Sequence, residues 1–229
     1  MMTSTCIFDA YGTLFDVSGA AKQAASTPEG QALADHWPAL AASWRAKQLE
    51  YTWLRAITGA HTDFWQVTQD SLDWSLEAMG LDQDATLRAQ LLDLYRALPA
   101  YPEVPEILRS LKSMGKRCAI LSNGSPKMLE DAVESAGIAN FLDGLISVED
   151  AGVYKPDYAV YDLVGARFDT SADEVLFVSS NGWDAAGAAG YGFYTLWVNR
   201  MGQPIDRMPW RPRFVAADLT GITDVLEEI

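Results

Sequence analysis

The sequence is poor in three residue types that carry common chemistries: cysteine, histidine and the basic residues. It holds two cysteines and two histidines in 229 residues. So few histidines disfavour zinc hydrolases and Ser-His-Asp enzymes, which take metal ligands or a general base from this residue type. Cys6 and Cys118 each lie in a short apolar run. We therefore expect two buried free thiols and a reducing, cytoplasmic environment rather than a disulfide.

Positive charge is also scarce, because 17 lysine and arginine residues face 31 aspartate and glutamate residues, for a formal net charge of −14. Such a chain repels phosphate backbones and anionic membranes, so we expect neither nucleic acid nor membrane as a partner. We also expect no signal peptide and no transmembrane span, since no basic segment precedes an apolar run and no uncharged stretch is long enough. An anionic substrate would need a site that gathers the few cations.

What is present is a strand–helix alternation. Short apolar, β-rich runs span residues 5–8, 117–121, 144–148, 174–179 and 193–198. From the second run onward, helical patterns follow at 126–136, 156–166 and 183–189. Nearly continuous apolar strands that alternate with helices are typical of a parallel sheet covered on both faces. The sequence therefore predicts an α/β fold with a Rossmann-like, doubly wound parallel sheet as its core.

The long gap between the first and second strands is different. Apolar residues recur there at helical spacing with little strand signal. We predict a helical cap subdomain over residues 16–98, inserted after the first strand, and a catalytic core formed by residues 1–15 and 99–229. Prolines at 99, 102 and 105 mark the return to the core and suggest a hinge. Four of the eight tryptophans lie between Trp37 and Trp65, in a stretch that could bury against a second subunit.

Polar residues gather where three of the predicted strands end. The first strand leads into Asp9–Thr13, the second into Ser122–Ser125 and the fourth into Ser179–Asp184, and Lys155 precedes the fourth strand. Open parallel sheets bind ligands at the carboxyl ends of their strands, so we expect these residues to converge. An aspartate after a strand is most often a helix cap, and a lysine before proline is usually solvated. Their coincidence at several strand ends favours a functional site.

Five segments carry a resemblance to a known family. FDAYGTLFD, WRAKQLEYTWLR, ILSNGSP, VYKPDYAVY and FVSSNGWD resemble the motifs and cap segment of the L-2-haloacid dehalogenase branch of the haloacid dehalogenase superfamily. The resemblance covers nearly the whole chain. It implies a cytoplasmic hydrolase, commonly a homodimer, that acts on a short 2-halocarboxylate. The implied reaction converts (S)-2-haloacids to (R)-2-hydroxyacids and halide through an aspartyl ester, with inversion at C2 and without metal or other cofactor.

The resemblance also assigns roles to individual residues. It implies catalytic roles for Asp9, Thr13, Arg45, Ser122, Lys155, Tyr161, Ser179, Asn181 and Asp184. It implies substrate-binding roles for Ala10, Tyr11, Arg45, Leu49, Phe64, Ser122, Asn123 and Trp183. Asp9 is the expected nucleophile, Lys155 keeps it ionised, and Asp184 positions or activates the hydrolytic water. Arg45, Asn123 and Trp183 are expected to receive the halide.

Two other functions stay open at this point. Phosphatases of the superfamily carry an aspartate two residues after the nucleophile and bind Mg²⁺, whereas this chain has Tyr11 there and SSN in place of a downstream acidic pair. A halide leaving group needs no proton, so dehalogenation tolerates both losses, while phosphoryl transfer does not. A Mg²⁺-dependent phosphatase is therefore one alternative, and a non-catalytic binding protein on the same fold is the other. For Leu49 and Phe64, ordinary packing in the cap is an equal expectation.

Overall fold

The computed structural model describes residues 3–17, 36–95 and 97–229. One parallel sheet of six strands forms its centre, in the order β3-β2-β1-β4-β5-β6. The strands are β1 (Thr5–Phe8), β2 (Arg117–Ser122), β3 (Gly144–Ser147), β4 (Val175–Ser179), β5 (Tyr194–Val198) and β6 (Phe214–Ala216). The order reverses between β1 and β4, which makes their carboxyl ends the topological switch point. The predicted doubly wound core is confirmed.

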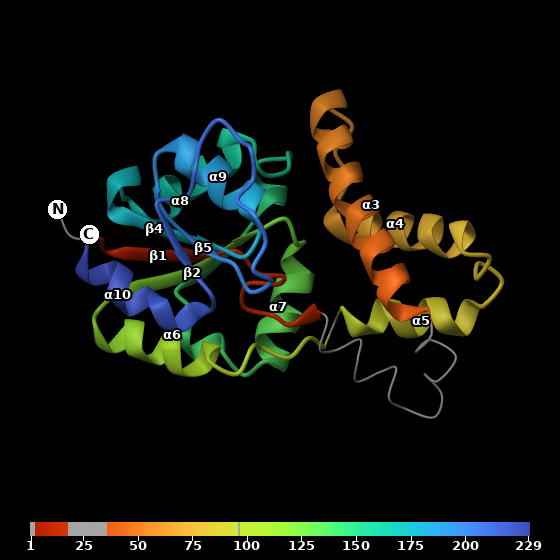
Figure 1. The fold of residues 1–229 in the computed structure, drawn as a ribbon, viewed down its shortest axis with the longest axis horizontal. Coiled ribbons are helices and arrows are strands. Elements are labelled where there is room, and N and C mark those ends of the chain that lie inside the picture. Colours follow the sequence, from red (N-terminus) through yellow and green to blue (C-terminus); the bar gives the residue numbers. More distant parts are fainter. Residues whose placement is uncertain (1–2, 18–35, 96) are drawn as a thin grey trace.

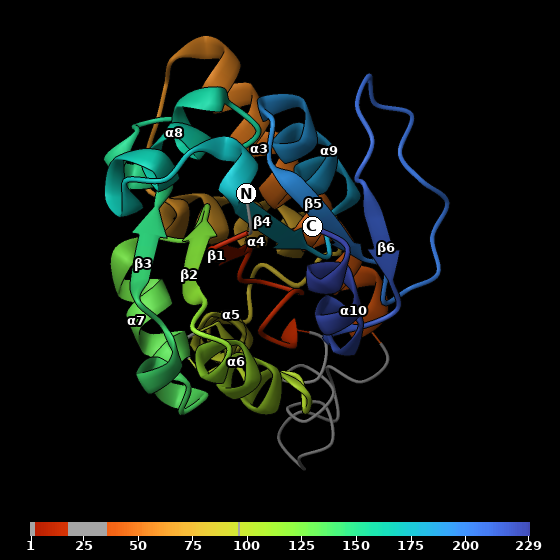
Figure 2. The same ribbon diagram turned by 90° about the vertical axis from the view of Figure 1, so that its left-hand side faces the viewer.

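Helices cover both faces of this sheet, as Figures 1 and 2 show. One layer holds α6 (Val104–Ser113), α7 (Pro126–Ser135) and α10 (Ile222–Glu227), and the other holds α8 (Tyr158–Phe168) and α9 (Gly182–Tyr191). The central strands β1 and β4 are buried along their whole length, which explains why they read as unbroken apolar runs. Cys6 and Cys118 are neighbours in register on β1 and β2, and both are free and buried, as expected.

Two sequence predictions need correction. Helix α8 begins at Tyr158 rather than at Pro156, because the Asp157 side chain accepts a hydrogen bond from the Ala159 N–H (2.9 Å) and caps the helix. The edge strand β6 was not predicted. Its three residues are apolar but none of them is fully buried, and the strand is shorter than the other five, so its sequence signal is brief.

Three further helices lie to one side of the sheet, beyond the carboxyl ends of its strands (Figure 1). They are α3 (Trp37–Thr58), α4 (Phe64–Ala78) and α5 (Ala85–Leu94), and they confirm the helical patterns between the first two strands. Leu40, Trp44, Gln48 and Thr52 form the buried stripe of α3, with a spacing of four residues. Helix α3 ends at Thr58, and the next residue, Gly59, caps it in the left-handed conformation (φ 66°).

The two segments that connect these helices to the sheet lie side by side. The Asp16 N–H donates to the Pro99 carbonyl (2.8 Å), and the Tyr101 N–H donates to the Leu14 carbonyl (2.9 Å). This pairing occurs next to the predicted boundaries of the cap, whose residues 18–35 and 96 lie outside the described ranges. Within those ranges, none of the helices combines the length and the apolar composition needed to cross a bilayer.

Candidate active site

The residues predicted at the strand ends meet around one small cavity at the switch point. It encloses about 270 Å³ with its mouth included. Its lining consists of Asp9, Tyr11, Arg45, Leu49, Phe64, Ser122, Asn123, Lys155, Asn181 and Trp183, and the sequence had named every one of them as a candidate. The remaining candidates, Ala10, Thr13, Tyr161, Ser179 and Asp184, are buried around the cavity rather than in its wall.

Asp9 follows β1 directly and is only 6% exposed. Its Oδ2 accepts hydrogen bonds from Thr13 Oγ1 (3.1 Å) and Asn181 Nδ2 (3.0 Å). Its Oδ1 lies 3.3 Å from Lys155 Nζ. These contacts fix the orientation of the carboxylate and set a cation beside it.

Lys155 is itself buried and serves two carboxylates. Its Nζ lies 2.9 Å from Asp184 Oδ2 as well as beside Asp9. Burial raises the pKa of Asp184, against the opposing effect of the Lys155 charge. Tyr161 donates its hydroxyl to Asp184 Oδ1 (2.9 Å), and burial holds the pKa of that phenol well above its ordinary value. Tyr161 is therefore a permanent donor to the carboxylate, a role that the sequence did not reveal.

Thr13 ties the ends of β1 and β4 together. Its hydroxyl oxygen accepts the backbone N–H of Ser180 (2.8 Å), while its own hydrogen has two acceptors at 3.1 Å, Asp9 Oδ2 and Ser180 Oγ. The intervening Gly12 has φ of 84°, in the left-handed region, and a Cβ there would approach Ser180 Oγ to 3.0 Å. The turn after Asp9 thus favours glycine, first for its conformation and second for this close approach.

Short polar contacts hold the other strand-end loops. Ser122 Oγ accepts the N–H of Gly124 (3.1 Å), and Ser179 Oγ accepts the N–H of Asn181 in the same manner (3.1 Å). Asn123 Oδ1 accepts the backbone N–H of Lys155 (3.1 Å), which leaves the amide nitrogen of Asn123 as its donating end. Ser122 and Asn123 line the cavity, whereas Ser179 shapes the loop behind it.

Arg45 reaches the cavity from helix α3. Its Nη2 donates to Asn181 Oδ1 (3.2 Å), and its Nη1 donates to Gln48 Oε1 (2.9 Å). Gln48 is fully buried and donates in turn to Thr68 Oγ1 (2.8 Å). Sequence reasoning missed Gln48, because a glutamine within a helix usually faces solvent. The one available signal was its place four residues after Trp44, on the apolar stripe.

Aromatic rings form the apolar part of the wall. Tyr11 stacks on Phe64, with ring centroids 6.1 Å apart, and contacts Tyr95 at 5.9 Å. Trp183 meets Trp53 of helix α3 edge to face at 5.6 Å. Among the described residues, the buried indole N–H of Trp183 has no hydrogen-bond partner, so it can donate to a bound ligand. The cavity therefore combines an apolar wall with a few aimed donors.

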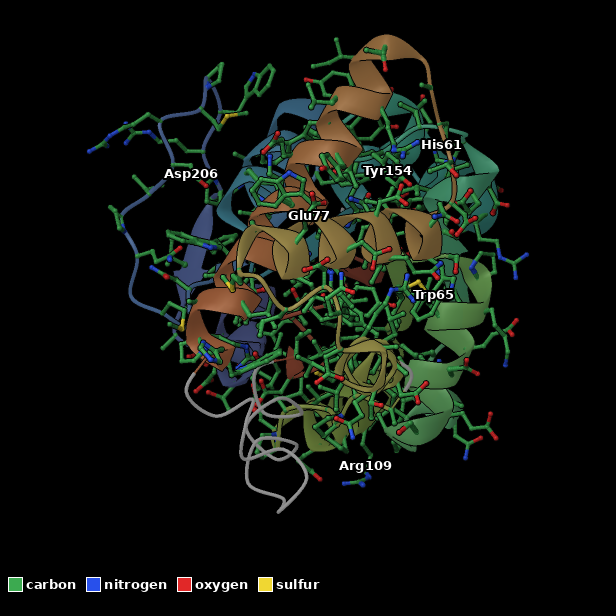
Figure 3. All side chains as sticks on the ribbon, turned by 90° about the vertical axis from the view of Figure 1, so that its right-hand side faces the viewer. His61, Trp65, Glu77, Arg109, Tyr154 and Asp206 are labelled. Carbon is green, nitrogen blue, oxygen red and sulfur yellow. The ribbon has the colours of Figure 1, made fainter. Side chains whose placement is uncertain are left out.

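A second set of contacts joins helix α4 and the turn before it to the sheet side. His61 Nε2 lies 2.9 Å from Glu149 Oε2, and the Phe64 N–H donates to Glu149 Oε1 (3.3 Å). The Tyr154 hydroxyl donates to the Thr62 carbonyl. Figure 3 looks onto these helices and shows His61 beside Tyr154, whose ring centroids are 4.8 Å apart. From the sequence we assigned no role to His61. In the structure it contacts Glu149, which also accepts the Phe64 N–H, and so helps to join the start of α4 to the sheet side.

Two cationic side chains, Lys155 and Arg45, line the cavity. Across the described ranges, no three His, Cys, Asp or Glu side chains gather into a set that could hold a metal ion. Tyr11, which stands where related phosphatases carry an aspartate, packs among aromatic rings.

Comparisons with known proteins agree on one family. The family model for haloacid dehalogenase-like hydrolases matches residues 3–192. The (S)-2-haloacid dehalogenase of Pseudomonas sp. strain YL is 41% identical over 220 residues, which cover 96% of this chain and 93% of that protein. (S)-2-haloacid dehalogenase 1 of Pseudomonas sp. strain CBS-3 is 44% identical over 199 residues, covering 87% and 86%. The L-2-haloacid dehalogenase of Xanthobacter autotrophicus, solved with chloropropionic acid covalently bound, superposes over all of both chains with a TM-score of 0.90 and 33% identity.

Proposed function

Because the chain belongs to the haloacid dehalogenase-like hydrolase family, we propose that it hydrolyses (S)-2-haloacids to (R)-2-hydroxyacids and halide. The observation that supports this proposal most strongly is the environment of Asp9. Its carboxylate is nearly buried, contacts Thr13, Asn181 and Lys155, and lines a small cavity with apolar walls. A carboxylate is a weak nucleophile in water and becomes effective when it is oriented and shielded from solvent. The activities named for the similar dehalogenases support the same reaction.

The reaction proceeds in two steps. An Asp9 oxygen bonds to C2 while the carbon–halogen bond breaks on the opposite side, so the halide leaves with the bonding electrons and C2 inverts. Water then adds to the carboxyl carbon of Asp9, the ester bond to that carbon breaks, and the oxygen that leaves with the product takes one of the two protons of this water, while a base takes the other. The product keeps the former Asp9 oxygen, and Asp9 regains one from water. Asp184 is our candidate for this base, since its raised pKa suits that role.

The substrate divides into ends that need different partners. Its carboxylate needs donors, and Ser122 with the backbone N–H groups around Ala10, Tyr11 and Asn123 can supply them. The departing halide gathers negative charge, which the Arg45 guanidinium, the Asn123 amide and the Trp183 indole N–H can receive. Leu49 and Phe64 then wall the apolar part of the substrate.

The alternatives have less support. A Mg²⁺-dependent phosphatase would need acidic ligands beside Asp9, where the chain places Tyr11 and Asn181 instead. A non-catalytic binding protein would not need Lys155 buried between Asp9 and Asp184, an arrangement that carries a desolvation cost.

We further propose a cytoplasmic homodimer with neither nucleic acid nor membrane as a partner. The charge of −14 supports the second part. Exposed apolar side chains on helices α3 and α4, namely Trp53, Leu54, Ile57 and Trp74, support burial against a second copy. Sedimentation velocity would test the dimer, and a single monomeric species at micromolar concentration would contradict it.

The test of the activity is chloride release from each enantiomer of 2-chloropropionate in the presence of EDTA. We expect release from the (S) enantiomer alone, with (R)-lactate as the organic product. Release that stops with EDTA and returns with Mg²⁺ would contradict the metal-independent reaction. Phosphate release from esters without any chloride release would favour the phosphatase.

A further inference from the structure

A second cavity adjoins the reaction cavity. It encloses about 660 Å³ with its mouth included and lies where the first half of helix α3 and the residue after α5 approach the ends of β1 and β4. The two cavities share Tyr11, Arg45 and Asn181 as lining residues. The groups that hold Asp9 and the expected halide are therefore also the partition between the two spaces.

Beyond this partition, the second cavity is mostly apolar. Its own lining includes Val17, Trp37, Ala41, Trp44 and Tyr95. Trp44 directs its indole N–H away, to the Thr68 carbonyl (2.8 Å), so its ring is an apolar surface. Polar atoms enter chiefly at the partition.

An unbroken row of aromatic rings leads from one cavity to the other. Phe64 lines the reaction cavity and stacks on Tyr11, which belongs to both. Tyr11 contacts Tyr95, and Tyr95 contacts Trp44, with centroids 4.9 Å apart, in the second cavity. The carboxylate and the halogen of a 2-haloacid have polar partners near Asp9. The alkyl substituent on C2 is therefore the group that would contact these aromatic rings.

We propose that the second cavity binds the alkyl chain of 2-haloalkanoates longer than propionate, with Ala41 as a residue that sets the accepted length. The proposal rests on the proposed function, which it extends from the smallest 2-haloacids to a class with apolar chains. Each methylene moved from water into apolar space is worth up to about fourfold in affinity. Hexanoate has three methylenes more than propionate, so the full gain would reach roughly sixtyfold.

The test compares two neighbouring substitutions on helix α3. Ala41→Phe adds bulk in the lining of the second cavity, whereas Ala42→Phe adds the same bulk at an exposed position outside both linings. Calorimetry would measure the affinity of each protein for unhalogenated hexanoate and propionate, and halide release would give kcat/KM for (S)-2-chlorohexanoate and (S)-2-chloropropionate. Thermal unfolding would verify that both variants are folded.

We expect wild type to bind hexanoate at least tenfold more tightly than propionate. Ala41→Phe should lower the hexanoate-to-propionate ratio at least tenfold in affinity and in kcat/KM, and Ala42→Phe should leave both ratios within twofold. Equal losses for both acids in Ala41→Phe, or unchanged ratios, would overturn the chain-binding role. Absence of halide release in wild type would overturn the proposed reaction instead, and the two affinities would still decide the binding site.

Discussion

The ammonium of Lys155 lies 2.9 Å from the Asp184 carboxylate, and both side chains are shielded from solvent, at 1% and 0% exposure. The same ammonium lies 3.3 Å from Asp9. One buried cation thus lies between two carboxylates, that of Asp9, the proposed nucleophile, and that of Asp184, the proposed base. Removing a partner from a buried ion pair leaves an uncompensated charge, which is far more costly than losing a surface pair.

Lys155→Met should therefore abolish activity and destabilise the fold. We expect the free energy of unfolding at pH 7 to fall by about 3–5 kcal/mol, since two carboxylates are left without their cation. Adding Asp184→Asn to Lys155→Met removes one of these charges and should restore part of the stability but no activity. Denaturant titration measures all three proteins. A double variant less stable than Lys155→Met would show that the two residues are not coupled in this way.

Tyr161→Phe should change the pH profile of kcat. Burial raises the pKa of Asp184 above its ordinary value of 3.8. As the pH drops through this raised pKa, Asp184 becomes protonated and can no longer act as a base, so kcat falls. Tyr161 donates to the ionised form, and a hydrogen bond to a charged group is worth about 1.5–3 kcal/mol. Its removal should move the acid limb of kcat upward by about one to two pH units.

The profile of Asp184→Asn supplies the comparison. If Asp184 is the base, this variant loses the limb together with most of its turnover. An acid limb that stays in place in both Tyr161→Phe and Asp184→Asn would assign it to another group.

The parts of the site that could be predicted share a physical cause. Parallel strands end at one edge of the sheet, so polar residues after apolar runs, such as Asp9 and Asn181, were identifiable from the chain alone. The placement of Arg45 needed the resemblance, because one cation on a helix is usually solvated. Gln48 and His61 were missed. Gln48 donates to Thr68 and His61 contacts Glu149, and these pairs are distant in the sequence, so that only the packing of α3, α4 and the sheet brings them together.

Gln48 should act on the reaction through Arg45. Gln48→Met keeps the volume of the side chain but removes the acceptor of Arg45 Nη1, so the guanidinium loses one of its two fixed contacts. Because a hydrogen bond to a charged group is worth about 1.5 kcal/mol or more, kcat/KM should fall about tenfold. Glu50→Gln, on the exposed side of the same helix, should have no such effect. Equal kinetics in both variants would assign Gln48 a role in packing alone.

The contact between His61 and Glu149 should affect substrate binding. Glu149→Gln removes the carboxylate that contacts His61 and accepts the Phe64 N–H, two contacts that hold the start of α4 against the sheet side. A partly exposed polar contact of this kind contributes up to about 1 kcal/mol, so KM should rise by about threefold to fivefold with little change in kcat. Asp150→Asn, at the exposed neighbouring carboxylate, is the matched control. A fall in kcat with unchanged KM would contradict a role in holding the helices over the cavity.

The central claim is that Asp9 forms an ester whose carboxyl carbon is then attacked by water. A single turnover with enzyme in excess over (S)-2-chloropropionate, in water enriched in the heavy oxygen isotope, tests it directly. Mass spectrometry of the peptide containing Asp9 and of the lactate locates the isotope. The ester mechanism predicts heavy oxygen in Asp9 and ordinary oxygen at C2 of the lactate. Heavy oxygen at C2 in that first turnover would contradict it, because water would then have attacked the substrate with Asp9 acting only as a base.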